Sequence, residues 1–244
     1  MKIKEKLFYL REYFFPSACG CCGEALLSCE DAYLGLCVSC RAIFESFFEN
    51  EKHCAYCGKV LISENDLCLS CRGNGAIENG RYSAPLVKLR CLFPYSGKYR
   101  SVLGSYKFGK ALGVGNFLSR FIPLALDGLD LSGKTAWVPV PPRPGKIKKQ
   151  GWDQIEYLAK QLEAKSPLTV CRCLKRLPSR SQKELNQAER GINLKGRIRC
   201  IGQPPETAIV FDDVITTGAT IHECAEVLLK AGSKNVYGVC LFYD

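Results

Sequence analysis

The clearest hydrophobic pattern lies near the C-terminal end of the chain, where a short apolar run gives way to a helical repeat. Residues 208–211 are all apolar, which predicts a buried strand, and the carboxylates of Asp212 and Asp213 stand where this strand would end. After a threonine-rich turn, apolar residues recur at the i, i+3, i+4 and i+7 spacing of a helix between positions 221 and 228, and Gly232 ends that helix. The pattern therefore predicts a strand, a turn and a helix in that order.

A second unit of the same kind precedes this one. Residues 135–141 read as another buried strand stopped by prolines, and a helix with its apolar face between positions 155 and 162 follows. Strands that alternate with helices predict an α/β fold with a mostly parallel sheet flanked by helices, in which ligands bind at the carboxyl ends of the strands. The loop between this strand and helix is cationic and suits a pyrophosphate or a nucleic-acid backbone, through Arg143, Lys146, Lys148 and Lys149.

The turn after Asp213 has the features of an anion site. A helix N-terminus presents free N–H groups and the positive end of its dipole, and Gly218 lets the backbone approach a ligand closely. Two adjacent carboxylates add nothing to phosphate binding, but they suit the two vicinal hydroxyls of a ribose. An ordinary Asp-rich turn between a core strand and a helix is the alternative interpretation. The hydroxyls that could donate to phosphate oxygens belong to Thr216, Thr217 and Thr220.

This segment resembles the phosphoribosyl-pyrophosphate (PRPP) signature of type I phosphoribosyltransferases. The resemblance implies that Asp212 and Asp213 accept hydrogen bonds from the ribose 2′- and 3′-hydroxyls, and that PRPP enters with Mg²⁺. It also implies that the turn cradles the 5′-phosphate, through Thr216, Thr217, Gly218, Ala219 and Thr220.

The cysteines predict two zinc sites at the other end of the chain. Ten of the sixteen cysteines lie within the first 71 residues, where the pattern CxxCG…LCxSCR occurs twice. Each copy supplies four thiolates, enough for one tetrahedral, structural Zn²⁺, while Cys21 and Cys29 are left over. We favour two successive zinc ribbons over a cross-braced pairing. The first zinc would take Cys19, Cys22, Cys37 and Cys40, and the second Cys54, Cys57, Cys68 and Cys71.

The length of 244 residues suits one full domain and a smaller one. We expect an N-terminal helix and the double zinc ribbon over residues 1–72, a Gly/Asn-rich linker over 73–85, and a phosphoribosyltransferase-like domain over 86–244. No apolar run approaches the roughly 20 residues of a membrane span. The first fifteen residues carry charges throughout and lack the apolar centre of a signal peptide, so we expect a cytoplasmic protein.

The net charge of +10 is concentrated in one segment. Residues 142–200 contain fifteen Lys and Arg against five Asp and Glu, which accounts for the whole surplus. A solvated basic face is the default interpretation, but a localised surplus favours a polyanionic partner such as pyrophosphate or nucleic acid. Four aromatic residues could stack on bases or pack in the core instead: Tyr33, Tyr56, Trp152 and Tyr157.

Nearly the whole chain resembles the ComF family. Apart from the ribbons and the signature, the resemblance rests on residues 106–108, 138–141 and 150–154, and on Gln182, Arg190 and Asn193. It implies that these last three residues belong to a flexible loop that closes over the site. The chain departs from the family at two positions, because Gln150 replaces an arginine and Asp153 replaces an asparagine. The missing arginine weakens any phosphate contact assigned to position 150.

The ComF resemblance implies a role in natural transformation, in which the protein handles incoming single-stranded DNA near a helicase or a recombination-mediator protein. Two functions remain open. The chain is either an adaptor that binds PRPP and DNA, or an active phosphoribosyltransferase that transfers ribose 5-phosphate to a nucleobase or amine and releases pyrophosphate. The sequence shows no recognisable general base or acceptor pocket.

Overall fold

The computed structural model describes residues 10, 12, 14–48, 52–73, 86–127, 129–131, 133–178 and 196–244. Most of the predicted N-terminal helix, and the predicted linker apart from Gly73, lie outside the described residues. Within the described ranges, no helix combines the length and the apolar character that a membrane span requires.

The centre of the molecule is a five-stranded sheet in the order β1-β7-β6-β2-β3, with every neighbouring pair parallel. The predicted α/β class with a parallel sheet is therefore confirmed. A separate two-stranded antiparallel sheet pairs β4 with β5. The strands are β1 (Lys88–Pro94), β2 (Thr135–Pro139), β3 (Thr169–Val170), β4 (Leu174–Arg176), β5 (Ile198–Cys200), β6 (Thr207–Ile215) and β7 (Asn235–Tyr243).

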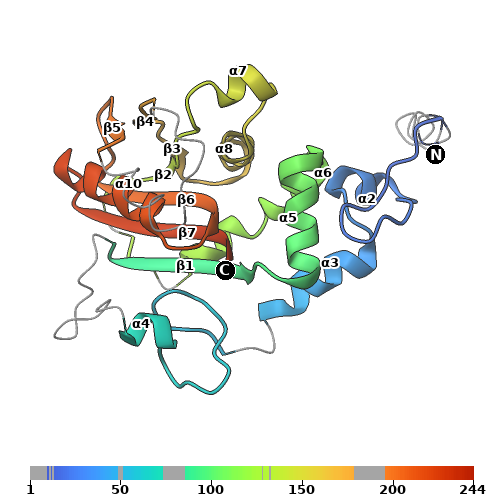
Figure 1. Cartoon of the computed structure of the whole chain (residues 1–244), viewed down its shortest axis with the longest axis horizontal. Coiled ribbons are helices and arrows are strands. Elements are labelled where there is room, and N and C mark those ends of the chain that lie inside the picture. Colours follow the sequence, from blue (N-terminus) through green and yellow to red (C-terminus); the bar gives the residue numbers. More distant parts are fainter. Residues whose placement is uncertain are drawn as a thin grey trace.

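Helices cover both faces of this sheet, as Figure 1 shows. On one face, Ile209 and Phe211 pack with α5, α6 and α8, and on the other Ala208 and Val210 pack with α10. The helices are α2 (Cys29–Leu34), α3 (Val38–Glu45), α4 (Leu69–Gly73), α5 (Gly97–Gly109), α6 (Leu112–Leu118), α7 (Lys146–Gln150), α8 (Gln154–Lys165) and α10 (Ala219–Lys230), with 3-10 turns η1 (Ser46–Phe48) and η2 (Ile122–Leu126).

Strand β6 is longer than its apolar run predicts. It continues through both carboxylates to Ile215, because β7 goes on pairing with it as far as Ile215 and Tyr243. The expectation that the strand ends before Asp212 is therefore wrong by four residues. The predicted cationic loop also differs, since its three lysines lie in the short helix α7.

The strand order places a crevice between β2 and β6. The chain leaves β2 through α8 and returns to the sheet at β3, on one side of β2. It leaves β6 through α10 and returns at β7, on the opposite side of β6. Because the two connections diverge, the carboxyl ends of β2 and β6 border an opening where ligands bind in parallel α/β sheets.

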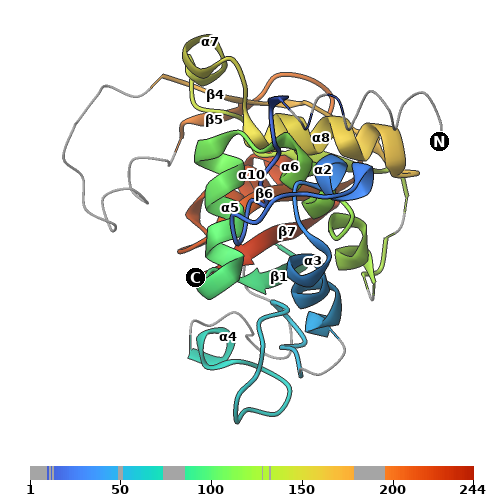
Figure 2. The ribbon, with the colours of Figure 1, turned by 90° about the vertical axis from the view of Figure 1, so that its right-hand side faces the viewer.

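The first ribbon, defined here as residues 19–40, packs against α6. A Cβ added at Gly113 would lie 2.7 Å from the backbone nitrogen of Gly35 and 2.9 Å from its Cα. Asn116 donates a side-chain hydrogen bond to the Tyr33 carbonyl oxygen at 3.0 Å. The buried leucines at positions 34 and 36 belong to the same hydrophobic core as Phe117. Figures 1 and 2 both show α2 and α3 beside α5 and α6.

The second ribbon, residues 54–71, lies on the edge strand β1. The Cys91 N–H donates to the Cys57 carbonyl oxygen at 2.8 Å, and a Cβ at Gly58 would meet the Cys91 carbonyl oxygen at 2.7 Å. Lys59 Nζ donates to the carbonyl oxygen of Asp244 at 2.7 Å. This ribbon therefore covers an edge that would otherwise expose unpaired backbone groups.

Candidate functional site

A cavity of about 500 Å³ opens at the carboxyl ends of β2 and β6. Its volume lies within the range of small-molecule sites. The structure brings the two signature carboxylates and most of the predicted cationic residues into the wall of this one cavity, although they are separated by some sixty residues of sequence. The charged residues that line it are Lys107, Arg143, Lys146, Lys149, Asp153, Arg176, Asp212 and Asp213.

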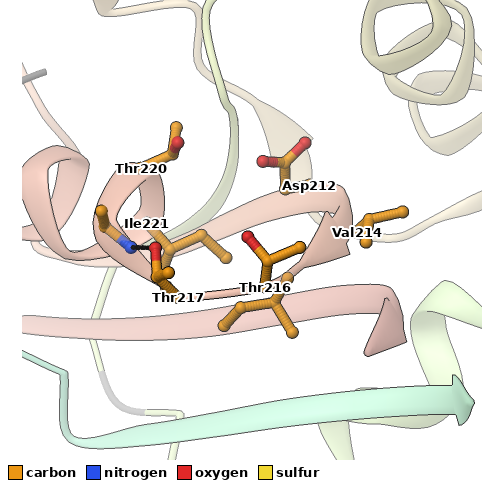
Figure 3. Close-up of a pocket in the computed structure, with 9 residues that line it drawn as sticks. Asp212, Val214, Thr216, Thr217, Thr220 and Ile221 are labelled. Carbon is orange, nitrogen blue, oxygen red and sulfur yellow. Dashed lines mark hydrogen bonds between the residues drawn. The ribbon is translucent and has the colours of Figure 1, made fainter. Parts of the chain in front are cut away.

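A smaller hollow of about 40 Å³ adjoins this cavity at the turn between β6 and α10. It shares Asp212 and Thr220 with the larger cavity, and it has room for a group of only a few heavy atoms. Figure 3 shows Asp212 and the threonine side chains arranged around the turn. Its lining includes every residue predicted to cradle a phosphate: Thr216, Thr217, Gly218, Ala219 and Thr220.

The backbone of this turn is shaped for an anion. Gly218 precedes α10 with φ of 77°, a left-handed conformation that other residues adopt at a cost. No side chain among the described residues caps α10 at this position, and the Ala219 N–H makes only a long bond of 3.4 Å to Thr217 Oγ1, drawn in Figure 3. The N–H groups of the first turn therefore face the hollow with little competition from the protein.

The two carboxylates differ in their surroundings. Asp213 is only 4% exposed, and its Oδ1 forms an ion pair with Lys107 Nζ at 2.9 Å. Its Oδ2 is buried and has no hydrogen-bond partner among the described residues. Because a buried carboxylate oxygen without a partner costs free energy, this atom is suited to accepting a hydrogen bond from a ligand.

Asp212 is half-buried and lies beside the charge of Asp213. Burial, and then the negative charge of Asp213, raise the pKa of Asp212 to about 8, although Lys107 acts in the opposite direction. A proton on Asp212 at neutral pH relieves the repulsion between the neighbouring carboxylates. A ligand that brings positive charge or hydroxyl donors favours loss of this proton.

The cations of the cavity are held in two ways. Lys146 is neutralised within the protein, since its Nζ donates to Asp153 Oδ2 at 2.6 Å and also contacts Gln154. Arg143 and Lys149 are exposed, and neither forms an ion pair within the described part of the chain. Lys148 is exposed too, but it lines a neighbouring groove rather than this cavity. Of the four predicted cationic residues, Arg143 and Lys149 are thus free to meet an anion here.

The residue at position 153 has a structural role. Asp153 caps α8, because its Oδ1 accepts hydrogen bonds from the N–H groups of Ile155 and Glu156 at 2.9 and 3.0 Å. Its second oxygen accepts from Lys146. An asparagine could form the same cap but would place an uncharged amide beside the lysine. The aspartate of this chain instead neutralises the charge of Lys146.

Most of the aromatic residues suggested for base stacking are engaged elsewhere. Trp152 packs edge-to-face on Tyr106 with ring centroids 5.4 Å apart, and the Tyr157 hydroxyl donates to Asn116 at 2.8 Å. Tyr56 is buried. Tyr33 is the exposed member of the four, at 53%.

The structure gathers the N-terminal cysteines into two sequential groups and not into cross-braced ones. Within each group the four sulfur atoms lie within 4.8 Å of one another. The Cys22 and Cys37 sulfurs are 3.8 Å apart, and those of Cys57 and Cys68 are 3.6 Å apart. A tetrahedron with Zn–S bonds of about 2.3 Å has edges of about 3.8 Å, so both groups fit a zinc ion.

The backbone of the two groups repeats as their sequence does. The Cys37 N–H points at Cys19 Sγ, and the Cys68 N–H points at Cys54 Sγ, both at 3.4 Å. Such N–H···S contacts stabilise the negative charge of metal-bound thiolates. The groups differ in exposure, because Cys22 is exposed whereas all four cysteines of the second group are buried.

The six cysteines that follow residue 71 lie outside both groups. Four of them are buried, namely Cys91, Cys173, Cys224 and Cys240. Cys171 and Cys200 are half-buried, and Cys200 is the last residue of β5. The left-over residues of the N-terminal region are partly or fully exposed, Cys21 and Cys29.

Comparison with known proteins shows what the chain is similar to. No protein-family model matches the chain. The chain is 27% identical over 206 residues to competence protein ComFC of Streptococcus pneumoniae, covering 82% of this chain and 84% of that protein. It is 25% identical over 217 residues to competence protein F of Haemophilus influenzae, covering 83% and 87%. It is also 25% identical over 206 residues to the DNA utilization protein YhgH of Escherichia coli, covering 77% and 88%. These similarities, which extend along most of the chain, support an assignment to the ComF family.

Two cationic residues line the cavity without having been predicted for it. Lys107 was noted only as part of a motif, and it proves to be the ion-pair partner of Asp213. Arg176 lines the cavity from β4, and burial and the charge of Arg143 lower its pKa. Nothing local in the sequence distinguishes Arg176 from the other cations of its segment. It lines the cavity because the chain fold places the end of β4 there. The predicted flexible-loop residues lie outside the described residues: Gln182, Arg190 and Asn193.

Proposed function

We propose that this protein binds PRPP in the cavity between β2 and β6 and handles single-stranded DNA in bacterial DNA uptake or utilisation. The observation that carries the PRPP assignment is the shared wall of the cavity. Hydroxyl acceptors, a backbone anion hollow and free cations meet there, which matches the ribose, the 5′-phosphate and the pyrophosphate of this ligand.

In this proposal Asp212 and the unpartnered Oδ2 of Asp213 accept from the ribose hydroxyls, and the hollow before α10 receives the 5′-phosphate. Arg143, Lys149 and Arg176 neutralise the pyrophosphate. Magnesium would enter with PRPP, since carboxylate and phosphate oxygens are the ligands it prefers, and it would screen the pyrophosphate charge. Lys107 is a positioning residue, because it fixes the carboxylate of Asp213.

The DNA part of the proposal rests on the relatives and on charge. Proteins similar along most of the chain are named for competence and for DNA utilization. The basic surplus of residues 142–200 supplies the positive field that a DNA backbone requires. We propose a cytoplasmic adaptor that passes incoming single strands to a helicase or a recombination-mediator protein, as the family resemblance implies.

Calorimetry tests the PRPP site. Replacing both Asp212 and Asp213 by alanine should abolish the heat of PRPP binding in the presence of Mg²⁺, because the ribose loses both acceptors. A matched double variant, Asp127→Ala with Asp130→Ala, removes two exposed aspartates outside the cavity and should bind normally. Equal affinity in the two double variants would falsify the assignment.

We also propose that each ribbon holds one structural zinc, which substitutes for a hydrophobic core too small to be stable by itself. Metal analysis of the purified protein should return about two zinc ions per chain, from the count of four thiolates per ion. A value near one would contradict the assignment of eight ligands.

A second function is favoured by the protonation of Asp212. At neutral pH a carboxyl with a pKa of about 8 is mostly protonated, so Asp212 would become a general base for an acceptor once the bound ligand has favoured loss of its proton. This favours an active phosphoribosyltransferase. Incubation with PRPP and candidate nucleobases, amines or DNA should then release pyrophosphate, and a Asp212→Asn variant should lose the release while it retains part of the binding. If no acceptor gives release above the background of PRPP alone, the adaptor function stands.

A further inference from the structure

An apolar groove of about 590 Å³ lies beside the PRPP cavity, and the proposed function does not use it. One wall is formed by the segment after β2, with Pro142, Pro144 and the exposed side chain of Ile147. The other wall is formed by Leu174 and Leu177 at β4. No aromatic or hydroxyl side chain of the described residues lines it. The surface between the two walls therefore offers a ligand mainly apolar contact.

The charges around this groove have one sign. Arg143 and Arg176 line both the groove and the PRPP cavity, and therefore form the partition between them. Lys148 and Lys175 line the groove alone and are exposed. No Asp or Glu of the described residues lines it. The complementary occupant has an apolar body and a negatively charged edge.

We infer that the groove holds a base of single-stranded DNA, with the flanking phosphates at Arg143, Arg176, Lys148 and Lys175. A nucleotide base is a flat body that gains from apolar burial, and its phosphates meet the four cations. The proline, leucine and isoleucine side chains of the wall carry no donor or acceptor, and the four cations are assigned to phosphates, so binding tolerates any base, as an adaptor for incoming DNA of arbitrary sequence requires. This inference rests on the DNA half of the proposed function and gives it a location next to PRPP.

The test compares two labelled strands of roughly ten nucleotides, an oligothymidylate and an abasic strand of equal length, by fluorescence anisotropy at one fixed salt concentration. The full-length protein should bind the oligothymidylate at least about fivefold more tightly than the abasic strand, the minimum expected for one accommodated base. Ile147→Glu should remove this preference, because it replaces apolar surface of the groove by a charged carboxylate that a base would have to desolvate.

Ile201→Glu is the matched control. Ile201 is 62% exposed and Ile147 is 45% exposed, but Ile201 lies outside the groove. The control variant should keep the preference for the oligothymidylate, and both variants should bind PRPP with Mg²⁺ as the unchanged protein does. A second pair tests the cations, since Arg143→Gln should weaken both DNA strands several-fold more than Arg199→Gln, which removes the same charge from the exposed face of β5.

The outcomes separate the groove from the proposed function. If the unchanged protein binds neither strand, the DNA function fails and the groove assignment fails with it. If it binds both strands equally, or if Ile147→Glu keeps the preference as Ile201→Glu does, the DNA function stands and the groove assignment is wrong. A shift of Ile147→Glu to a different oligomeric state, with DNA binding intact, would show that the groove is a contact between copies of the chain.

Discussion

At the scale of single residues, the site is organised by what its two carboxylates can and cannot pair with. Lys107 satisfies one oxygen of Asp213, and the other oxygen stays buried without a partner among the described residues. Asp212 keeps its proton well above the usual pH range for an aspartate. These two carboxyl groups therefore make the fold without ligand less stable. A ligand that pairs with them removes this cost, so the lost stability contributes to the affinity for the ligand.

The raised pKa of Asp212 predicts a pH dependence of stability. Between the ordinary aspartate pKa near 4 and the folded value of about 8, the folded chain keeps a proton that the unfolded chain has lost, so this residue makes the fold less stable as pH rises. The ionisable groups near it are Asp153, Asp213, Lys107, Arg176, Cys224 and Cys240. Asp212→Asn has no such proton, so its stability lacks this fall with pH. When the pH is raised from about 6 to about 8.5, the unfolding free energy of the variant should therefore rise by at least about 1 kcal/mol relative to that of the unchanged protein.

Urea unfolding at the two pH values measures this difference. Both proteins share the effects of pH on zinc binding, and these cancel in the comparison. Asp127→Asn, at an exposed position, should show no relative gain. Parallel pH profiles for Asp212→Asn and the unchanged protein would mean that Asp212 is ionised in the folded state at neutral pH.

At the scale of elements, close backbone contacts fix how the first ribbon sits on the body of the protein. Gly113 at the start of α6 and Gly35 after α2 approach so closely that neither has room for a side chain. Gly35 also has a positive φ of 65°, which suits glycine. The contact couples α2 to α6 and brings both into the core that includes Phe44 and Phe117.

Gly113→Ala should therefore destabilise the protein by about 1–3 kcal/mol, the usual cost of overpacking. Gly104→Ala is the control, because Gly104 lies inside α5 with no atom within 4 Å of an added Cβ. That change should stabilise the protein by about 0.5–1 kcal/mol through helix propensity. Opposite shifts of the thermal midpoint are expected, and a shift of the same sign and size in both variants would show that the ribbon does not rest on Gly113.

The elements also show which parts of the fold can be predicted from the sequence alone. Local periodicity predicted β2, α8 and α10 almost to their ends, and the repeat predicted the two cysteine groups, because these patterns depend on near neighbours. The extension of β6 to Ile215 depends on its register with β7, and Lys107 and Arg176 reach the cavity from α5 and β4, respectively. Such contacts join distant parts of the chain and leave no periodic signal.

At the scale of the whole molecule, the two ribbons are attached differently. The first ribbon lies beside α5 and α6 with Cys22 exposed, whereas the second lies on β1 with all four cysteines buried. The Val60 N–H donates to the Tyr243 hydroxyl at 3.1 Å, so the second ribbon also contacts the last residues of the chain. A chelator can therefore reach the first metal site more easily than the second.

Zinc release to a coloured chelator should consequently follow two phases, a fast one from the first ribbon and a slow one from the second. Cys22→Ser should remove or accelerate the fast phase and leave the slow phase unchanged. Cys29→Ser changes an exposed cysteine outside both groups and should alter neither phase. A single phase for both ions, or loss of the slow phase in Cys22→Ser, would contradict independent sites.

The pairing of β1 with β7 also affects the order in which parts of the protein can fold during synthesis. All eight clustered cysteines precede β1, so the nascent chain can capture zinc while most of it is still being synthesised. The sheet cannot form completely at that stage, because β1 pairs with β7, which follows the other described strands in the chain. The two cysteine groups can therefore form before the ligand cavity, which needs β2 and β6. A ribosome stalled before β7 would carry a zinc-loaded protein with its first strand unpaired.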